Sequence, residues 1–216
     1  MKDLLSAIDF RGEFYRLLSS FFLKEASLEV MERLSSSPLL PMKGKKGIGD
    51  LIPPKGKDLK SFKEEIDVDF ARTFLGLNSR GAFPYESVYR SKLGLLMQDP
   101  FDETMEFYNG MGLKKNPDVK EPEDHIGIEL TFMGALASQT GMALKNDKKK
   151  EALAHLEQQR KFLRQHLSSW VPSFCKDVRE VASTEFYKSL ASLLETWISS
   201  DSEELERLIR LLRAKG

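Results

Sequence analysis

Apolar residues recur at intervals of three or four positions along most of the chain, the spacing that places them on one face of an α-helix. No stretch alternates polar and apolar residues in the manner of strands joined by hairpin turns, so a sheet is not expected. The sequence therefore predicts an all-α helical bundle. Its amphipathic helices are expected over residues 4–23, 62–77, 126–144, 153–167 and 178–197, with a short one over 203–212.

Two segments interrupt this periodicity. Residues 35–60 contain four prolines, four glycines and a surplus of lysine, a composition that prevents a continuous helix. We expect a flexible surface loop there, at about residues 38–58. The second segment, residues 109–123, ends where acidic side chains favour the start of the next helix. At 216 residues the chain is long enough to bury one substantial core, so residues 1–216 are predicted to form a single helical domain.

Composition excludes several classes of protein. The chain has 33 basic and 33 acidic residues, so its zero net charge gives no general attraction to nucleic acid or anionic lipid. Cys175 is the only cysteine, which excludes an intrachain disulfide and favours a reducing compartment. No segment has the length and apolarity of a signal peptide or a membrane span. We therefore expect a cytoplasmic protein without stable membrane insertion, either a monomer or a homodimer.

Sequence signatures of enzymes are missing from the chain. No GxGxxG motif follows a strand, and the segment GKKGIGD lacks the Gly-Lys-Ser/Thr ending of a phosphate-binding loop. His155 and His166 belong to no pair with metal-ligand spacing. We expect neither a cofactor nor a metal, and we predict that the protein is not an enzyme.

A cluster of polar residues lies at the start of the helix expected over residues 126–144. His125 and Glu129 lie four positions apart and share a helix face, with Asp124 at the helix entrance. They could form a recognition cluster, or a catalytic or metal half-site in which carboxylates orient an imidazole. The structural alternative is that Asp124 caps the helix, His125 hydrogen-bonds a neighbour and Glu129 pairs with a surface cation.

A second candidate is the segment GAFPYESVYRS, and a run of acids supports it. Pro84 favours an extended approach, after which Tyr85 and Tyr89 lie one helical turn apart. Such rings can line a peptide groove, or they can be core residues with satisfied hydroxyls. Residues 99–129 hold nine acids against three lysines, which would attract a cationic ligand or form a solvated surface.

Three segments of the chain follow one another in this order: FARTFLGLNSRGAFPYESVY, EPEDHIGIELTFM and QQRKFLRQHLSSWVPSFCKDV. Together they resemble the TorD/DmsD family of chaperones for redox enzymes exported by the twin-arginine route. The resemblance implies an all-α bundle of the TorD-like type that binds a molybdopterin oxidoreductase before export. It implies recognition through the signal peptide of the catalytic subunit or through another surface of its apo-form.

Carrying the family pattern onto this chain implies a client-binding surface with a hydrophobic edge at Phe74, Leu75 and Gly76. The rest of that surface would consist of Pro84, Tyr85, Ser87, Tyr89, Pro122, Asp124, His125 and Glu129. Two alternatives remain open. One is a metal- or carboxylate-assisted hydrolase centred on Asp124, His125 and Glu129, and the other is a helical regulator that binds a small ligand.

Overall fold

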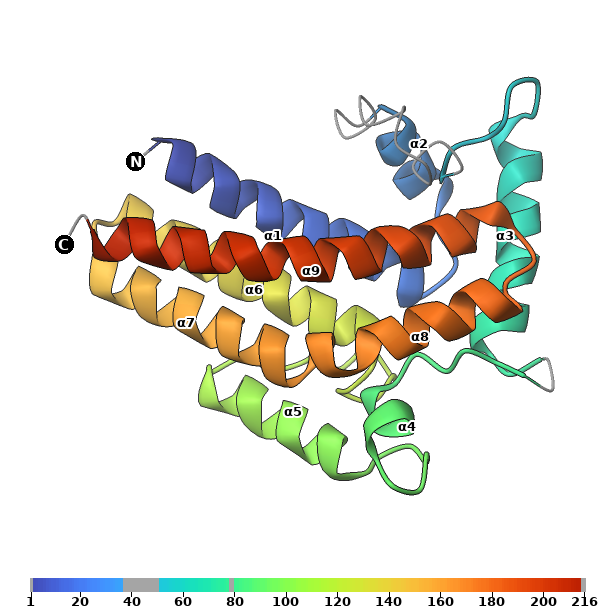
Figure 1. Ribbon diagram of the computed structural model, residues 1–216. Coiled ribbons are helices and arrows are strands. Elements are labelled where there is room, and N and C mark those ends of the chain that lie inside the picture. The colour runs from blue at the N-terminus through green and yellow to red at the C-terminus, as the bar shows by residue number, and fades with distance from the viewer. Residues whose placement is uncertain (1, 37–50, 78–79, 215–216) are drawn as a thin grey trace. The chain divides into compact units, whose positions relative to one another are not determined.

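The computed structural model describes residues 2–36, 51–77 and 80–214, and this part of the chain is helical without strands (Figure 1). The all-α prediction is therefore confirmed. The helices are α1 (Lys2–Phe22), α2 (Leu28–Ser36), α3 (Leu59–Phe74), α4 (Glu86–Arg90), α5 (Asp99–Gly110), α6 (Ile126–Lys145), α7 (Lys149–Gln165), α8 (Leu167–Val181) and α9 (Glu185–Arg213). None of these helices has both the length and the apolar character needed to cross a membrane.

Four predicted helices correspond to α1, α3, α6 and α7, but the C-terminal prediction is wrong. The helix expected over residues 178–197 is divided, because α8 ends at Val181 and α9 begins at Glu185. The short helix expected over 203–212 is the end of α9. Helices α2, α4 and α5 were not predicted. Much of the loop expected at 38–58 lies outside the described residues, which resume at Leu51.

The chain divides into two compact units, and three helices contribute to both. The first unit combines residues 1–19, 85–170 and 198–216, and the second combines residues 20–84 and 171–197. Helices α1, α8 and α9 each have residues in both units. The single domain expected from the sequence stays a prediction.

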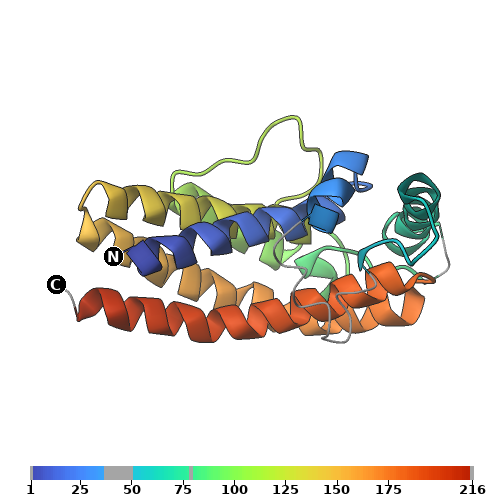
Figure 2. The same cartoon turned by 90° about the horizontal axis from the view of Figure 1, so that it is seen from above.

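The first unit is built around α6, which is buried over most of its length. Helix α7 follows after a short turn and runs back beside α6, and the first part of α1 lies along α6 on another side (Figures 1 and 2). Small residues permit this approach of α1 to α6. A Cβ atom on Gly134 would meet the carbonyl oxygen of Gly12 at 3.2 Å, a tighter contact than most side chains make, so glycine at this position favours the close approach.

The second unit has an aromatic core. Phe74 on α3 lies 5.8 Å from Phe22 and 5.3 Å from Tyr187 between ring centroids, both edge to face. Helix α3 begins where the side chain of Asp58 accepts a hydrogen bond from the backbone of Ser61 at 3.0 Å. It ends before Gly76, whose φ of 71° lies in the left-handed region that favours glycine after a helix. The sequence therefore encodes both ends of α3 locally.

Candidate functional site

Helix α4 is only five residues long and is held in place by Asp124. The carbonyl oxygen of Asp124 accepts a hydrogen bond from Glu86 N, and its side-chain Oδ2 accepts one from Ser87 N, both at 2.9 Å. Burial raises the pKa of Asp124, although the hydrogen bonds from Ser87 act in the opposite direction. A helix this short is unstable alone, so these contacts position it. Asp124 therefore caps α4 across the fold rather than the helix that follows it in sequence.

His125 caps α6. Its Nδ1 accepts a hydrogen bond from Gly127 N at 3.0 Å, so this ring nitrogen carries no proton. Burial lowers the pKa of His125 to about 3, which keeps the imidazole neutral at physiological pH. The ring lies edge to face with Tyr85 at 5.1 Å between centroids, and an isolated antiparallel bridge joins the same two residues. His125 thus links the start of α6 to the approach to α4.

Two buried carboxyl groups, those of Glu86 and Glu129, are neighbours inside the first unit. Glu129 Oε2 accepts a hydrogen bond from Trp170 Nε1 at 3.1 Å, whereas Oε1 meets no nitrogen or hydroxyl donor in the described part of the chain. Burial raises the pKa of Glu129 well above its ordinary value, and the proximity of Glu86 raises it further. The raised pKa favours the protonated form of Glu129, which can donate a hydrogen bond towards Glu86.

Glu86 also connects α4 to the junction of α7 and α8. Its Oε2 lies 2.9 Å from His166 Nδ1, and its Oε1 accepts a hydrogen bond from Arg90 Nη1 at 2.5 Å. Next to this junction, the ring of Tyr89 stacks on Trp170 at 5.5 Å between centroids. One short helix is therefore attached to α6, α7 and α8 through charged and aromatic side chains.

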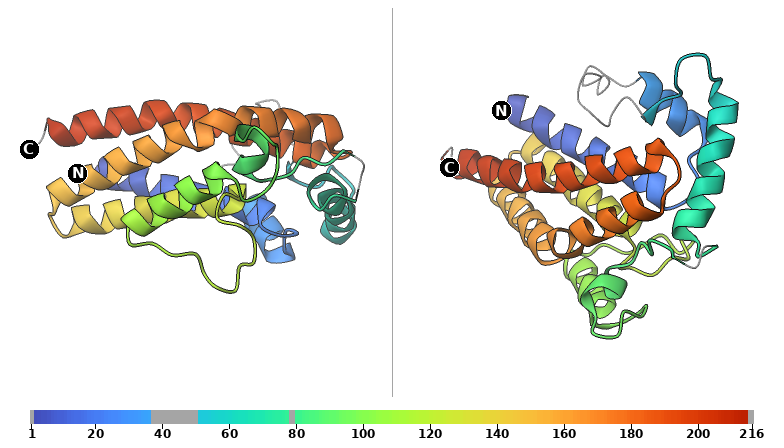
Figure 3. Two further views of the ribbon diagram at one scale, coloured as in Figure 1. Left: turned by 90° about the horizontal axis from the view of Figure 1, so that it is seen from below. Right: turned by 45° about the vertical axis from the view of Figure 1, so that its right-hand side comes forward.

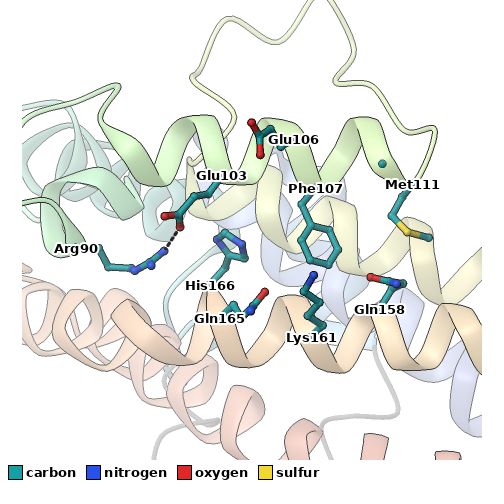
Figure 4. Close-up of a pocket in the computed structure, with 10 residues that line it drawn as sticks. Arg90, Glu103, Glu106, Phe107, Met111, Gln158, Lys161, Gln165 and His166 are labelled. Carbon is teal, nitrogen blue, oxygen red and sulfur yellow. Dashed lines mark hydrogen bonds and ion pairs between the residues drawn. The ribbon is translucent and has the colours of Figure 1, made fainter.

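A hollow of about 670 Å³ opens beside this network (Figure 4). Arg90 and His166, both bonded to Glu86, line it, so the hollow lies directly beside the buried network. Arg90 Nη1 also donates to Glu103 Oε2 at 3.1 Å across the opening. The rest of its lining comes from α5, the residue that follows α5, and α7: Glu106, Phe107, Gly110, Met111, Gln158, Lys161 and Gln165.

Tyr85 and Pro122 lie at the outer side of the same network. Tyr85 is half-buried, and its hydroxyl donates to Glu121 Oε2 at 2.5 Å. Burial and this acidic partner raise the pKa of Tyr85. Pro122 is partly exposed, and its carbonyl oxygen accepts a hydrogen bond from His125 N at 3.0 Å. Tyr85 precedes α4 whereas Tyr89 belongs to it, and the two rings contact different partners.

The other predicted site residues belong to the second unit. Phe74 and Pro84 are buried, whereas Leu75 is 59% exposed and Gly76 is exposed. Phe74 contributes to the aromatic core described above. Leu75 is therefore the member of the expected hydrophobic edge that presents an apolar side chain to solvent.

The structure brings together the predicted residues Tyr85, Ser87, Asp124, His125 and Glu129, but it buries most of them. Asp124 and Glu129 are fully buried, and His125 is 3% exposed. Among the described residues, no group of three or more His, Cys, Asp or Glu side chains is arranged to hold a metal ion. Sequence reasoning missed Glu86, Arg90, His166 and Trp170 as members of the network. The only sequence signal for the last two was their place in the third family-like segment.

Comparison with known proteins agrees with the three segments. Residues 55–176 match the family described as nitrate reductase delta subunit. A "Chaperone protein TorD" from Vibrio atlanticus is 30% identical over 215 residues, covering 95% of this chain and 99% of that protein. One from Aliivibrio fischeri is 30% identical over 213 residues, covering 93% and 97%. One from Vibrio cholerae is 29% identical over 223 residues, covering 97% and 98%.

Proposed function

Because the chain belongs to the nitrate reductase delta subunit family, which includes the TorD-like chaperones, we propose that it is a chaperone for the maturation of a molybdoenzyme. In this proposal it binds the catalytic subunit of a molybdopterin oxidoreductase in the cytoplasm before export. Binding through the twin-arginine signal peptide, through the apo-form of the subunit, or through both assists cofactor loading. The protein itself acts by binding and not as an enzyme.

Similarity over nearly the full length of both chains carries this proposal. The alignment with the protein from Vibrio atlanticus leaves only small parts of either chain uncovered. It therefore includes the scaffold and the segments that hold α4, rather than one short motif. Similarity over the whole length is stronger support for a shared function than a shared fold alone.

The buried and exposed members of the predicted site have different roles in this proposal. Asp124, His125 and Glu129 are inside the protein, so they position α4 and the segment before α6. Partly exposed residues on those segments, Tyr85 and Pro122 among them, are the ones a client can touch. Leu75 and Gly76 are exposed candidates in the second unit. This division explains why a motif of polar residues can serve recognition from inside the fold.

The hydrolase alternative has less support from the geometry. A general base needs a nitrogen or oxygen free to take a proton within reach of a substrate. Nδ1 of His125 is occupied by Gly127 N, and the ring is buried against Tyr85. Asp124 and Glu129 have no exposed side-chain surface. These contacts suit structural capping better than proton transfer to a bound substrate.

Titration with two client forms tests the proposal. The first is a twin-arginine signal peptide from a molybdopterin oxidoreductase, and the second is the apo-form of its catalytic subunit without that peptide. We expect saturable binding of at least one form. A peptide with glutamine at both arginine positions is the control and should bind more weakly if the signal peptide is recognised. Binding of neither client form by the folded protein would contradict the proposal.

A further inference from the structure

The loop between α4 and α5 exposes four large apolar side chains within five consecutive positions. Leu93, Leu95, Leu96 and Met97 are 70%, 56%, 46% and 61% exposed. The other exposed large apolar residues described in the first unit, Phe10, Met105, Met142 and Leu211, are dispersed over four helices. Contiguous apolar surface of this kind marks interaction sites on soluble proteins. We call residues 93–97 the apolar loop.

Hydrogen bonds at both ends hold the apolar loop in this exposed position. Ser87 N is fixed by Asp124, while Ser87 Oγ accepts a hydrogen bond from Gln98 N at 3.2 Å. At the other end, Gly94 N donates to Ser91 Oγ at 3.1 Å. The side-chain Nε2 of Gln98 also donates a hydrogen bond to the carbonyl oxygen of Leu96 at 3.0 Å. The loop is therefore attached through Ser87 to the buried network that positions α4. Figure 3 shows the loop as it leads from α4 to α5.

The backbone of the apolar loop adopts conformations that a side chain disfavours. Gly94 has a φ of 61°, which glycine tolerates, but Met97 has a φ of 54°. Left-handed backbone at a residue with a long side chain is strained, and such strain persists where surrounding contacts impose it. The flexible thioether side chain of methionine also adapts its shape to a partner.

The charge next to the apolar loop indicates what kind of partner it accepts. Residues 91–106 contain four carboxylates and one lysine, and all four carboxylates are exposed on α5. Glu103 pairs with Arg90, whereas Asp102 and Glu106 have no ion-pair partner among the described residues. These two lie one helical turn apart on one face. The surface therefore suits a segment that combines an apolar stretch with positive charges.

We infer that the apolar loop and the acids Asp102 and Glu106 form the docking surface for a twin-arginine signal peptide, with its apolar middle on the loop and its arginines on α5. This inference rests on the proposed function and adds the residues that carry it. A second copy of this chain fits less well, because a two-fold contact here would bring the acids of both copies together. An anionic membrane would be repelled by the same acids.

The test compares two triple variants in binding to two peptides. One variant carries Leu93→Ser, Leu95→Ser and Met97→Ser in the apolar loop. The control carries Phe10→Ser, Met142→Ser and Leu211→Ser, which also replace exposed apolar residues of the first unit. The probes are a twin-arginine signal peptide and the same peptide with serine and glycine in its apolar middle. Circular dichroism and light scattering establish that each variant is folded and report its mass.

We expect the loop variant to bind the intact peptide at least tenfold more weakly, and the control variant to bind it within twofold of the parent. For the peptide with the polar middle, parent and loop variant should agree within twofold. The double variant Asp102→Asn with Glu106→Gln should also bind the intact peptide about tenfold more weakly, with a smaller salt dependence. For the peptide with glutamine at both arginine positions, this variant and the parent should bind equally.

Several outcomes would overturn the inference. Equal affinity of parent and loop variant for the intact peptide would remove the loop from the site while leaving peptide binding intact. A loss as large with the polar-middle peptide would mean that the loop does not contact the apolar segment. Conversion of a parent dimer into a monomer by the loop variant, with unchanged peptide affinity, would identify a second copy as the occupant.

The docking surface and the proposed function would be contradicted by different results. If the parent binds no signal peptide but binds the apo-form of the catalytic subunit, the docking inference is wrong and the chaperone function stands. If the parent binds neither, both fail. If only the loop variant fails on the intact peptide, both are supported.

Discussion

At the scale of single residues, burial determines what the polar side chains of the site can do. A carboxyl group that is taken out of water favours its protonated form unless donors or cations compensate. Glu129 has one donor, the indole of Trp170, and a second carboxyl group, that of Glu86, as its other neighbour. Its pKa is consequently raised, and it is better placed to join helices than to bind a cationic ligand.

Replacing Glu129 with glutamine should make the stability of the protein less dependent on pH. The raised pKa means that the folded state keeps a proton which the unfolded chain releases, so stability falls as pH rises above about 4.5 towards the folded pKa. Glutamine cannot ionise, although it can accept from Trp170 and donate to Glu86. Denaturant unfolding of parent and variant across this pH range should give a smaller decline for the variant.

The matched control for this experiment is Glu106→Gln on the exposed side of α5. It removes one carboxylate without touching the buried network and should leave the decline unchanged. The raised pKa of Asp124 will preserve part of the slope in the Glu129 variant. A decline identical to that of the parent would mean that Glu129 does not hold the additional proton.

At the scale of elements, helix ends depend on partners far away in sequence. Asp69 on α3 accepts hydrogen bonds from the backbone and the hydroxyl of both Ser183 and Thr184, at 2.6 to 2.9 Å. These are the residues just before α9 begins at Glu185. Asp69 therefore closes the turn between α8 and α9, much as Asp124 starts α4.

Removing the side chain of Asp69 should destabilise the protein by about 2 kcal/mol or more, because a buried charged acceptor that receives four hydrogen bonds contributes strongly. Burial raises the pKa of Asp69, but the bonds from Thr184 and Ser183 outweigh it and lower the pKa overall. The contribution is thus present above about pH 3.8 and is lost as pH falls through the folded pKa.

Denaturant unfolding of Asp69→Ala at neutral pH measures this loss. The control is Glu64→Ala, which removes an exposed carboxylate from the same helix and should change stability by less than about 0.5 kcal/mol. The two losses should converge as the pH is lowered. Equal stability of the two variants at neutral pH would exclude Asp69 as the connection between α3 and α9.

At the scale of the whole molecule, each unit is assembled from distant parts of the chain. In the first unit, Arg11 on α1 and Asp201 on α9 form a buried pair although 190 positions separate them. Arg11 also donates to Gln159 Oε1 at 2.9 Å, and Tyr15 donates to Asp201 Oδ2 at 2.6 Å. The N-terminal, central and C-terminal parts of the chain therefore meet in one polar network inside this unit.

Replacing Arg11 with methionine should cost about 3–5 kcal/mol of stability, because it leaves the carboxylate of Asp201 buried without its cation. Adding Asp201→Leu should recover part of this loss, since an apolar pair needs no compensating charge. Denaturant unfolding of the two variants and the parent measures both effects. A double variant no more stable than Arg11→Met would show that the unpaired carboxylate is not the source of the loss.

The sequence alone determined the helical class and four of the main helices. The 3.6-residue period of apolar positions is visible locally, and the apolar face that it creates is the face that packs against other helices. It also determined the family, since three segments carried recognisable patterns in the right order. Asp58 and Gly76 mark the two ends of α3 by local signals, but the helix expected over residues 62–77 did not use them.

The tertiary structure alone decided where the C-terminal helices divide and what the polar residues of the site do. No local pattern shows that Asp69 stops α8 from continuing into α9, because that contact spans 114 positions. Likewise, Asp124 caps α4 instead of α6, since 37 positions separate it from Ser87 in sequence but not in space. Burial and hydrogen-bond partners depend on long-range packing. They decide whether a carboxyl group has a structural role in the interior or is available to bind a ligand.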